Sequence, residues 1–216
     1  MKIGMVYQAL LNLEEDDLEH HNSRWTDLLG LENGTIDIRD SILWGEQYLL
    51  SANLKAQNYK MLFNLYYTPL KLFKWGKRAD SKCPRCAQPE ADSIHMFAVC
   101  SSLTPYWVYI YELIGKMLAT KVQVTTQLIL FGMDGTQSRH PLLFLATVIG
   151  RIIIAAEWKQ VSAPSVNQWR NKLLACYYLE GPMYAMRGKK ARKRGELMWR
   201  PVAEWLGEET SCWNVV

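Results

Sequence analysis

The sequence contains no apolar segment long enough to cross a lipid bilayer. Its longest apolar run, Leu142 to Ala156, includes Arg151 and falls short of the about 20 residues that a transmembrane helix needs. A secretory signal is also lacking, because the acids Glu14 to Asp17 follow the first apolar residues almost at once. We therefore expect a protein without a membrane partner, in which residues 142–156 form a buried helix.

Cysteine is scarce and odd in number, with five among 216 residues. Secreted domains that depend on disulfides usually carry an even number of cysteines, whereas reducing compartments keep thiols free. The count favours an intracellular protein, in the nucleus, the cytoplasm or both.

Patterns typical of catalytic sites are also missing. The sequence has no Gly-rich phosphate loop, and no Ser, His and Asp lie at a spacing that supports nucleophilic catalysis. The acids Glu14 to Asp17 lack the hydrophobic hairpin that a two-metal site requires, so we interpret them as the solvated start of a helix. The chain is therefore predicted not to be an enzyme.

Helical periodicity dominates what remains, and we predict a mainly α fold. Helices are expected from Ser23 to Gly30, around residues 38–49, from about Leu54, after Cys100, over residues 142–158, from Ser165 and over residues 196–206. Asn33-Gly34 predicts a turn, and Gln168 three residues after Ser165 predicts a capping box.

Three features of the C-terminal half do not follow from helical periodicity alone. Residues 121–135 suit a short strand or an ordered loop. His140, before Pro141, is expected in a loop or cap, and Arg151 is expected to reach the protein edge rather than form a buried ion pair.

The clearest motif is a set of three cysteines and one histidine. Cys83 and Cys86 are separated by two residues, and His95 and Cys100 follow at a spacing that suits tetrahedral zinc. Five residues on a regular helix would set His95 and Cys100 roughly 140° apart, so the helix that carries His95 must loosen before Cys100. Asp92 is interpreted as the cap of that helix rather than as a hydrogen-bond partner of the imidazole.

Four protein ligands fill a tetrahedral shell, so the predicted Zn²⁺ is structural rather than catalytic. The competing interpretation is that the cysteines are small buried hydrophobes that lie close in sequence by chance. Cys176 and Cys212 have no nearby ligand partners and are left out of the site.

Charge is distributed unevenly along the chain. Residues 1–50 hold three basic side chains against ten acidic ones, and since the whole chain has a net charge of +4, the remainder carries +11. The segment from Lys55 to Arg85 contains eight basic residues and a single acid, Asp80. Among the basic residues are the aromatic residues Tyr66, Tyr67, Phe73 and Trp75. Cations that bind phosphate, mixed with rings that stack on bases, favour binding of RNA or single-stranded DNA.

Two groups of residues are candidate nucleic-acid contacts. They are Lys71, Lys74, Trp75, Lys77, Arg78, Lys82 and Arg85 near the predicted metal site, and Lys189, Lys190, Arg192, Lys193 and Arg194 in a basic loop near residues 187–194. In the competing interpretation Lys82 and Arg85 only balance the thiolates, and the aromatic residues belong to the core. The basic loop either has a function, as a phosphate contact or a nuclear import signal, or is a solvated linker.

Residues along the chain carry a family resemblance. They are Arg24-Trp25, Tyr59-Lys60, Tyr67 to Leu72, the four predicted ligands with Asp92 and Met96, Tyr106-Trp107, Ala155 to Lys159, Pro164-Ser165, Trp169 and Glu180. In this order they resemble the C-terminal, zinc-binding (CCHC) region of LINE-type non-LTR retrotransposon reverse-transcriptase polyproteins.

The resemblance implies a region that helps to hold template RNA and target DNA while an upstream polymerase and endonuclease do the chemistry. This chain has no Tyr-x-Asp-Asp polymerase signature, so we expect a terminal fragment whose function is binding.

The sequence thus predicts three segments: an N-terminal helical region (1–68), a zinc-binding segment (69–120) and a C-terminal helical region (121–216). The alternative function is a non-catalytic zinc-stapled helical scaffold that binds protein.

Overall fold

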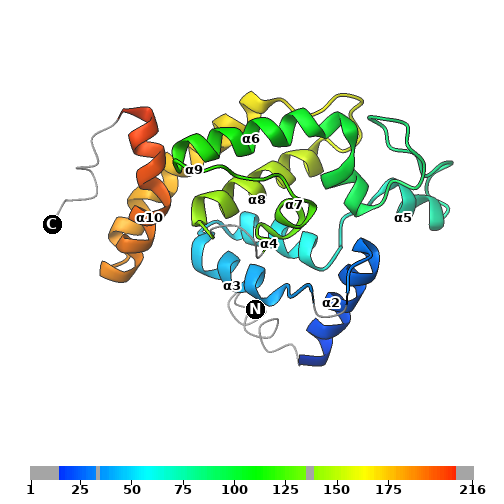
Figure 1. Ribbon diagram of the computed structural model, residues 1–216, viewed down its shortest axis with the longest axis horizontal. Coiled ribbons are helices and arrows are strands. Elements are labelled where there is room, and N and C mark those ends of the chain that lie inside the picture. The colour runs from blue at the N-terminus through cyan, green and yellow to red at the C-terminus, as the bar shows by residue number, and fades with distance from the viewer. Residues whose placement is uncertain (1–14, 33–34, 135–138, 208–216) are drawn as a thin grey trace.

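The computed structural model describes residues 15–32, 35–134 and 139–207, and within these ranges every regular element is helical (Figure 1). The predicted mainly α fold is confirmed. The elements are α2 (Glu15–Leu29), α3 (Arg39–Tyr48), α4 (Ala52–Leu62), α5 (Pro69–Lys74), the π-helical turn η1 (His95–Val99), the 3-10 turn η2 (Ser101–Leu103), α6 (Thr104–Met117), α7 (Thr126–Phe131), α8 (Pro141–Ala156), α9 (Val166–Met186) and α10 (Lys189–Leu206).

Helix α8 is the central element, and it confirms the predicted buried helix. It packs against α4, α6 and α9, and Figure 1 shows it between α6 and the α3–α4 pair. Its N-terminus follows from local chemistry, because Pro141 suits the first turn and His140 Nδ1 accepts a hydrogen bond from the backbone N–H of Leu142. His140 is therefore a capping residue, as predicted. No helix in the described ranges is long and apolar enough to cross a membrane.

A close approach between α6 and α8 connects the core to the segment that carries the metal ligands. A Cβ on Gly150 would lie 2.6 Å from Cζ3 of Trp107, so only glycine lets the ring pack there. The Trp107 Nε1–H donates to the Phe97 carbonyl at 2.7 Å, within η1. The hydrophobic core includes residues from all three predicted segments.

Residues 126–131 form helix α7 rather than a strand or loop. The Thr125 hydroxyl accepts from the Leu128 N–H at 3.1 Å, and Gly132 ends the helix at a φ of +77°. Residues 128–131 are all buried, so the apolar run has no exposed face that would reveal its period. The cap at Thr125 was the informative signal.

Helix α10 begins at Lys189, seven residues earlier than predicted, so the expected basic loop is a helix start. Lysine, arginine and alanine are good helix formers, and the buried residues Gly195, Met198 and Trp199 are on the same helix, which packs against α9. Packing therefore outweighs the unfavourable placement of cations near a helix N-terminus.

Other predicted helix ends agree with the structure. Gly30 follows α2 at a φ of +63°, and Ser165 with Gln168 forms the predicted capping box of α9. The predicted turn at Asn33-Gly34 lies outside the described residues.

Arg151 differs from its prediction. It does not reach the protein edge: its side chain is 1% exposed on α8, donating to the Leu130 carbonyl and, at 2.7 Å, to Asn58 Oδ1. Burial lowers the pKa of its guanidinium to about 10, opposed by the nearby Tyr66 and Tyr111. The group still carries its proton at neutral pH, so a buried cation is stabilised by oxygens of neutral groups and ties α8 to α4 and α7.

We expect Arg151→Ala to lower the free energy of unfolding by about 3–5 kcal/mol, because it leaves two buried oxygens without donors and creates a cavity. Arg139→Ala is the matched control, since it removes an exposed ion pair with Asp40 (2.7 Å) worth less than about 1 kcal/mol. Urea denaturation measures both. Equal effects would contradict a structural role for the buried guanidinium.

A second buried ionisable group lies at the contact between α9 and the start of α4. Glu180 is 5% exposed, and its Oε2 has no hydrogen-bond partner. Burial raises the pKa of its carboxyl to about 7, opposed by the backbone N–H groups of Ser51 and Leu50 and by Arg187. The folded protein therefore holds this proton at pH values where the unfolded chain has lost it.

It follows that the stability contributed by this group is present below about pH 4.5 and is lost as the pH rises toward about 7. We expect Glu180→Gln to be more stable than the wild type at pH 8, by up to about 3 kcal/mol, with the difference shrinking toward pH 5. The exposed Glu204→Gln is the control. A pH-independent difference in chemical denaturation between Glu180→Gln and wild type would be evidence against the raised pKa.

Candidate metal centre

Four side chains converge beside α5 at one end of the molecule. The ligand atoms of Cys83, Cys86, His95 and Cys100 all lie within 4.8 Å of one another, with 3.8 Å between the sulfurs of Cys83 and Cys100 and 3.2 Å between Cys86 Sγ and His95 Nε2. Ligands at about 2.3 Å from one tetrahedral ion lie about 3.8 Å apart. The predicted four residues are thus brought together and could bind a metal ion.

The Cys-x-x-Cys turn is held by its own backbone. The Ala87 N–H donates to the Cys83 carbonyl at 2.9 Å, and the Cys83 N–H donates to the Gln88 carbonyl at 2.8 Å. Ala87 has a φ of +59°, which a non-glycine residue adopts at some cost. The turn aims both sulfurs at one point, as a metal-binding turn requires.

The return segment solves the spacing problem between His95 and Cys100 with a π turn. Residues 95–99 form η1, and the Cys100 N–H donates to the His95 carbonyl at 3.1 Å, five residues back. This wider turn brings residues five apart closer to one face than an α-helix does. The predicted loosening of the helix is confirmed.

Asp92 caps the segment, as predicted, because its Oδ1 accepts from the His95 backbone N–H at 2.8 Å. Burial lowers the pKa of the His95 imidazole, with Asp92 opposing and Arg85 assisting the shift. At neutral pH the ring is therefore neutral, which is the form that binds a metal.

The thiols differ in their ease of ionisation. Desolvation opposes ionisation of Cys86, but hydrogen bonds to its sulfur outweigh this effect and lower its pKa. The donors are the backbone N–H groups of Gln88 and of Cys86 itself and the thiols of Cys100 and Cys83. Desolvation raises the pKa of Cys100 to about 11. A metal ion would bind the thiolate form of both.

Arg85 lies inside the protein rather than on a binding surface. It is 8% exposed and donates to the carbonyls of Ile154 (3.4 Å) and Glu157 (3.0 Å) at the end of α8. Desolvation lowers the pKa of its guanidinium, and the charges of Cys83 and Cys100 oppose that shift. Arg85 therefore lies away from the surface and close to the thiols, as its interpretation as their counter-charge expects.

Lys71 is half-buried, and its ammonium is bound within the protein. Its ammonium donates to the backbone carbonyl and Oδ1 of Asn64 and, at 3.1 Å, to the Tyr66 carbonyl. Burial lowers the pKa of Lys71 to about 8, with Arg24 assisting and Asp92 opposing. The sequence interpretation missed Asn64, whose φ of +52° after α4 is a conformation that Asn tolerates better than most residues.

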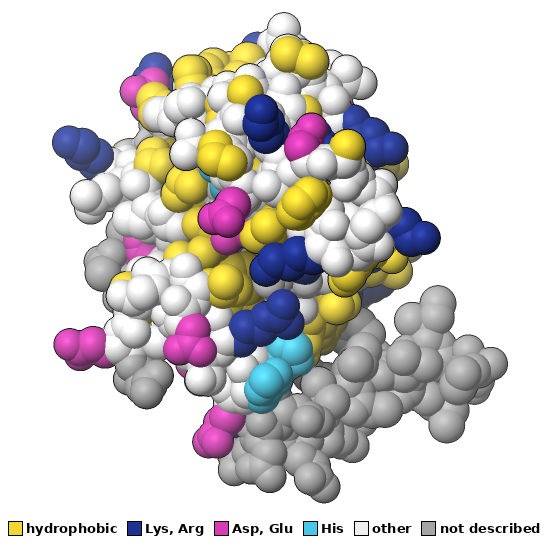
Figure 2. Space-filling view, turned by 90° about the vertical axis from the view of Figure 1, so that its right-hand side faces the viewer, with side chains coloured by type: hydrophobic (Ala, Val, Ile, Leu, Met, Phe, Trp, Pro, Cys, Tyr) yellow, Lys and Arg dark blue, Asp and Glu magenta, His cyan; other side chains and the backbone are white. Residues whose placement is uncertain are grey.

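The remaining candidates near the metal centre are on the surface. Lys74, Trp75, Lys77 and Lys82 are exposed, whereas Arg78 is half-buried and pairs with Asp80 at 3.3 Å. Tyr67 is 66% exposed, and its ring lies edge-on to the Trp75 ring, with 5.9 Å between the two ring centroids. Figure 2 shows the face at this end of the molecule, where Lys and Arg side chains are interspersed with Asp and Glu and with exposed apolar side chains.

The second basic group lies elsewhere. Helix α10, which carries residues 189–194, is at the opposite end of the longest axis from α5 (Figure 1). The two predicted groups of contacts therefore cannot form one continuous surface.

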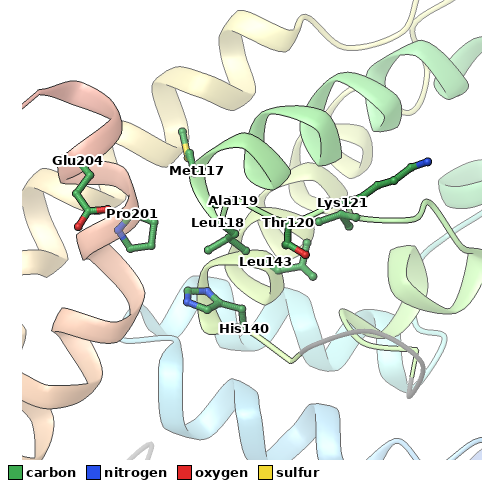
Figure 3. A pocket seen from close by; sticks show the side chains of 10 residues that line it. Met117, Leu118, Ala119, Thr120, Lys121, His140, Leu143, Pro201 and Glu204 are labelled. Atoms are coloured by element: carbon green, nitrogen blue, oxygen red, sulfur yellow. The ribbon is translucent and has the colours of Figure 1, made fainter.

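The other candidate sites give less evidence of a function. A hollow of about 360 Å³ between α6, α8 and α10 is lined by Leu118, Thr120, His140 and Glu204 among others (Figure 3). His140 already caps α8 there. Cys176 is buried on α9 and outside the cluster, as predicted, and Cys212 lies outside the described residues.

No protein-family model matches the chain. What the site can do therefore has to be argued from its own geometry.

We expect the purified protein to bind one equivalent of Co²⁺ with the visible spectrum of a tetrahedral thiolate complex, and Zn²⁺ to displace it. Cys86→Ser should weaken this binding strongly, because it removes one of three sulfur ligands. Cys176→Ser is the matched control, since it removes a buried thiol outside the cluster. A spectrum that is unchanged in Cys86→Ser would be inconsistent with the four-residue site.

Proposed function

We propose that the chain is a non-catalytic, zinc-stabilised module that binds RNA or single-stranded DNA. One observation carries the proposal: the segment that leads to the candidate metal centre exposes two aromatic rings, Tyr67 and Trp75, and the cations Lys74, Lys77 and Lys82. Burying two large rings would normally be favourable, so their exposure points to a ligand that covers them.

The donor set supports zinc as the metal. Three sulfurs and one imidazole nitrogen are a donor set that suits Zn²⁺, whereas Mg²⁺ and Ca²⁺ prefer oxygen ligands. Four protein ligands leave no coordination position for water or substrate, so the ion serves folding rather than catalysis.

The order of motifs supports an origin in the C-terminal region of a LINE-type reverse-transcriptase polyprotein. In that context the module's partner is an upstream polymerase, on the same chain or on another one. The proposed role is to hold nucleic acid while the polymerase acts.

A protein-binding scaffold is the second candidate, and one observation favours it. Helix α9 exposes a row of apolar side chains, among them Leu179 (71%) and Met186 (85%). Such a face is suited to a protein partner. The two candidates differ in their response to salt, because only phosphate binding releases counterions.

We expect fluorescence anisotropy to detect binding of labelled single-stranded RNA, with an affinity that falls steeply as salt rises. Lys74→Ala with Lys82→Ala should reduce the slope of log K against log salt by about 1.4, because each lost phosphate contact accounts for about 0.7. Trp75→Ala should weaken binding about tenfold through lost stacking.

Tyr178→Ala is the control for Trp75→Ala, since both rings are 56% exposed and Tyr178 is on α9. Absent binding at low salt, or binding that salt does not affect, would favour the scaffold.

A further inference from the structure

A groove of about 550 Å³ runs between the Cys-x-x-Cys turn and the end of α8. One wall is formed by Tyr67, Lys77 and Arg78, and the other by Trp158 and Lys159, with Pro84 between them. The two walls lie some eighty residues apart in the sequence. A count of charged residues along the sequence therefore could not predict that these two walls lie next to each other.

The groove is basic and aromatic. None of the side chains that line it is acidic, and the guanidinium of Arg78 is already paired with Asp80 at 3.3 Å. Lys77 and Lys159 are exposed, and the ammonium of Lys159 lies 5.5 Å from the centre of the Trp158 ring. Two exposed ammonium groups beside two aromatic rings suit phosphates that are followed by bases.

The metal-binding turn connects the two walls. Pro84 lies between the ligands Cys83 and Cys86, and the next residue, Arg85, donates to the carbonyls of Ile154 and Glu157, just before Trp158. The position of the second wall is therefore fixed relative to the turn by hydrogen bonds.

The groove also opens onto the surface of α5. Tyr67 lines it and lies edge-on to Trp75 at 5.9 Å. The rings of Trp75, Tyr67 and Trp158 therefore follow one another from α5 into the groove.

We infer that this groove is the path of a single-stranded nucleic-acid segment, with bases on Tyr67 and Trp158 and phosphates on Lys77 and Lys159. The inference rests on the proposed function and specifies its ligand, because only unpaired bases offer free faces for stacking. A duplex hides those faces.

The test compares a labelled oligouridylate with a hairpin of equal phosphate number, by anisotropy. Lys77→Ala with Lys159→Ala should reduce the salt slope for the oligouridylate by about 1.4, whereas Lys121→Ala with Lys172→Ala, which removes two other exposed lysines, should leave it unchanged. Tyr67→Leu, which keeps an apolar side chain, should weaken binding about tenfold, and Tyr178→Leu should not. The hairpin should bind more weakly than the oligouridylate.

The outcomes separate the groove from the proposed function. If Trp75→Ala loses affinity while Tyr67→Leu and the Lys77 and Lys159 changes have no effect, the groove is refuted and nucleic-acid binding stands. If the hairpin binds as well as the oligouridylate, the single-strand assignment is overturned. If the wild-type protein binds neither probe at low salt, the proposed function itself fails.

Discussion

Convergence of three sulfurs and one imidazole on one point is the constraint on which this end of the molecule depends. From Trp75 to Asp92 the chain has no helix, and its buried side chains are Cys83, Arg85 and Ala91. So little apolar surface cannot offset the conformational entropy of ordering about eighteen residues. A structural zinc ion, with an apparent binding free energy of about 10–16 kcal/mol in small peptides, could supply what the core does not.

Local signals in the sequence predicted local structure well. The Cys-x-x-Cys turn, the cap at Asp92, the capping box at Ser165 and the loosened helix before Cys100 each depend on residues within a few positions of one another. Their chemistry does not depend on the rest of the fold. The same reasoning missed α7, whose consecutive buried residues hide the helical period although the Thr125 cap marks its start. It also missed the start of α10, where packing against α9 decides the structure.

Cations were predicted less well, for a physical reason. Counting Lys and Arg along the chain cannot show which of them donate to carbonyl oxygens inside the protein. Lys71 donates to Asn64 and Tyr66, Arg85 to the end of α8, and Arg151 to Asn58 and Leu130, so all three hold elements together. The bonds of Arg85 to Glu157 and of Arg151 to Asn58 join residues that the fold, not the spacing, brings close, whereas those of Lys71 span five and seven residues.

The buried and the exposed cations near the candidate metal centre differ in their surroundings. Arg85 is buried beside the thiols and donates to the end of α8, whereas Lys77, Lys82 and Lys159 are exposed. A scaffold that needed its cations only to balance thiolates would not expose Tyr67 and Trp75 beside them. The combination of exposed rings and exposed ammonium groups therefore supports the proposed polyanionic ligand with stacking faces over a protein partner at this end of the molecule.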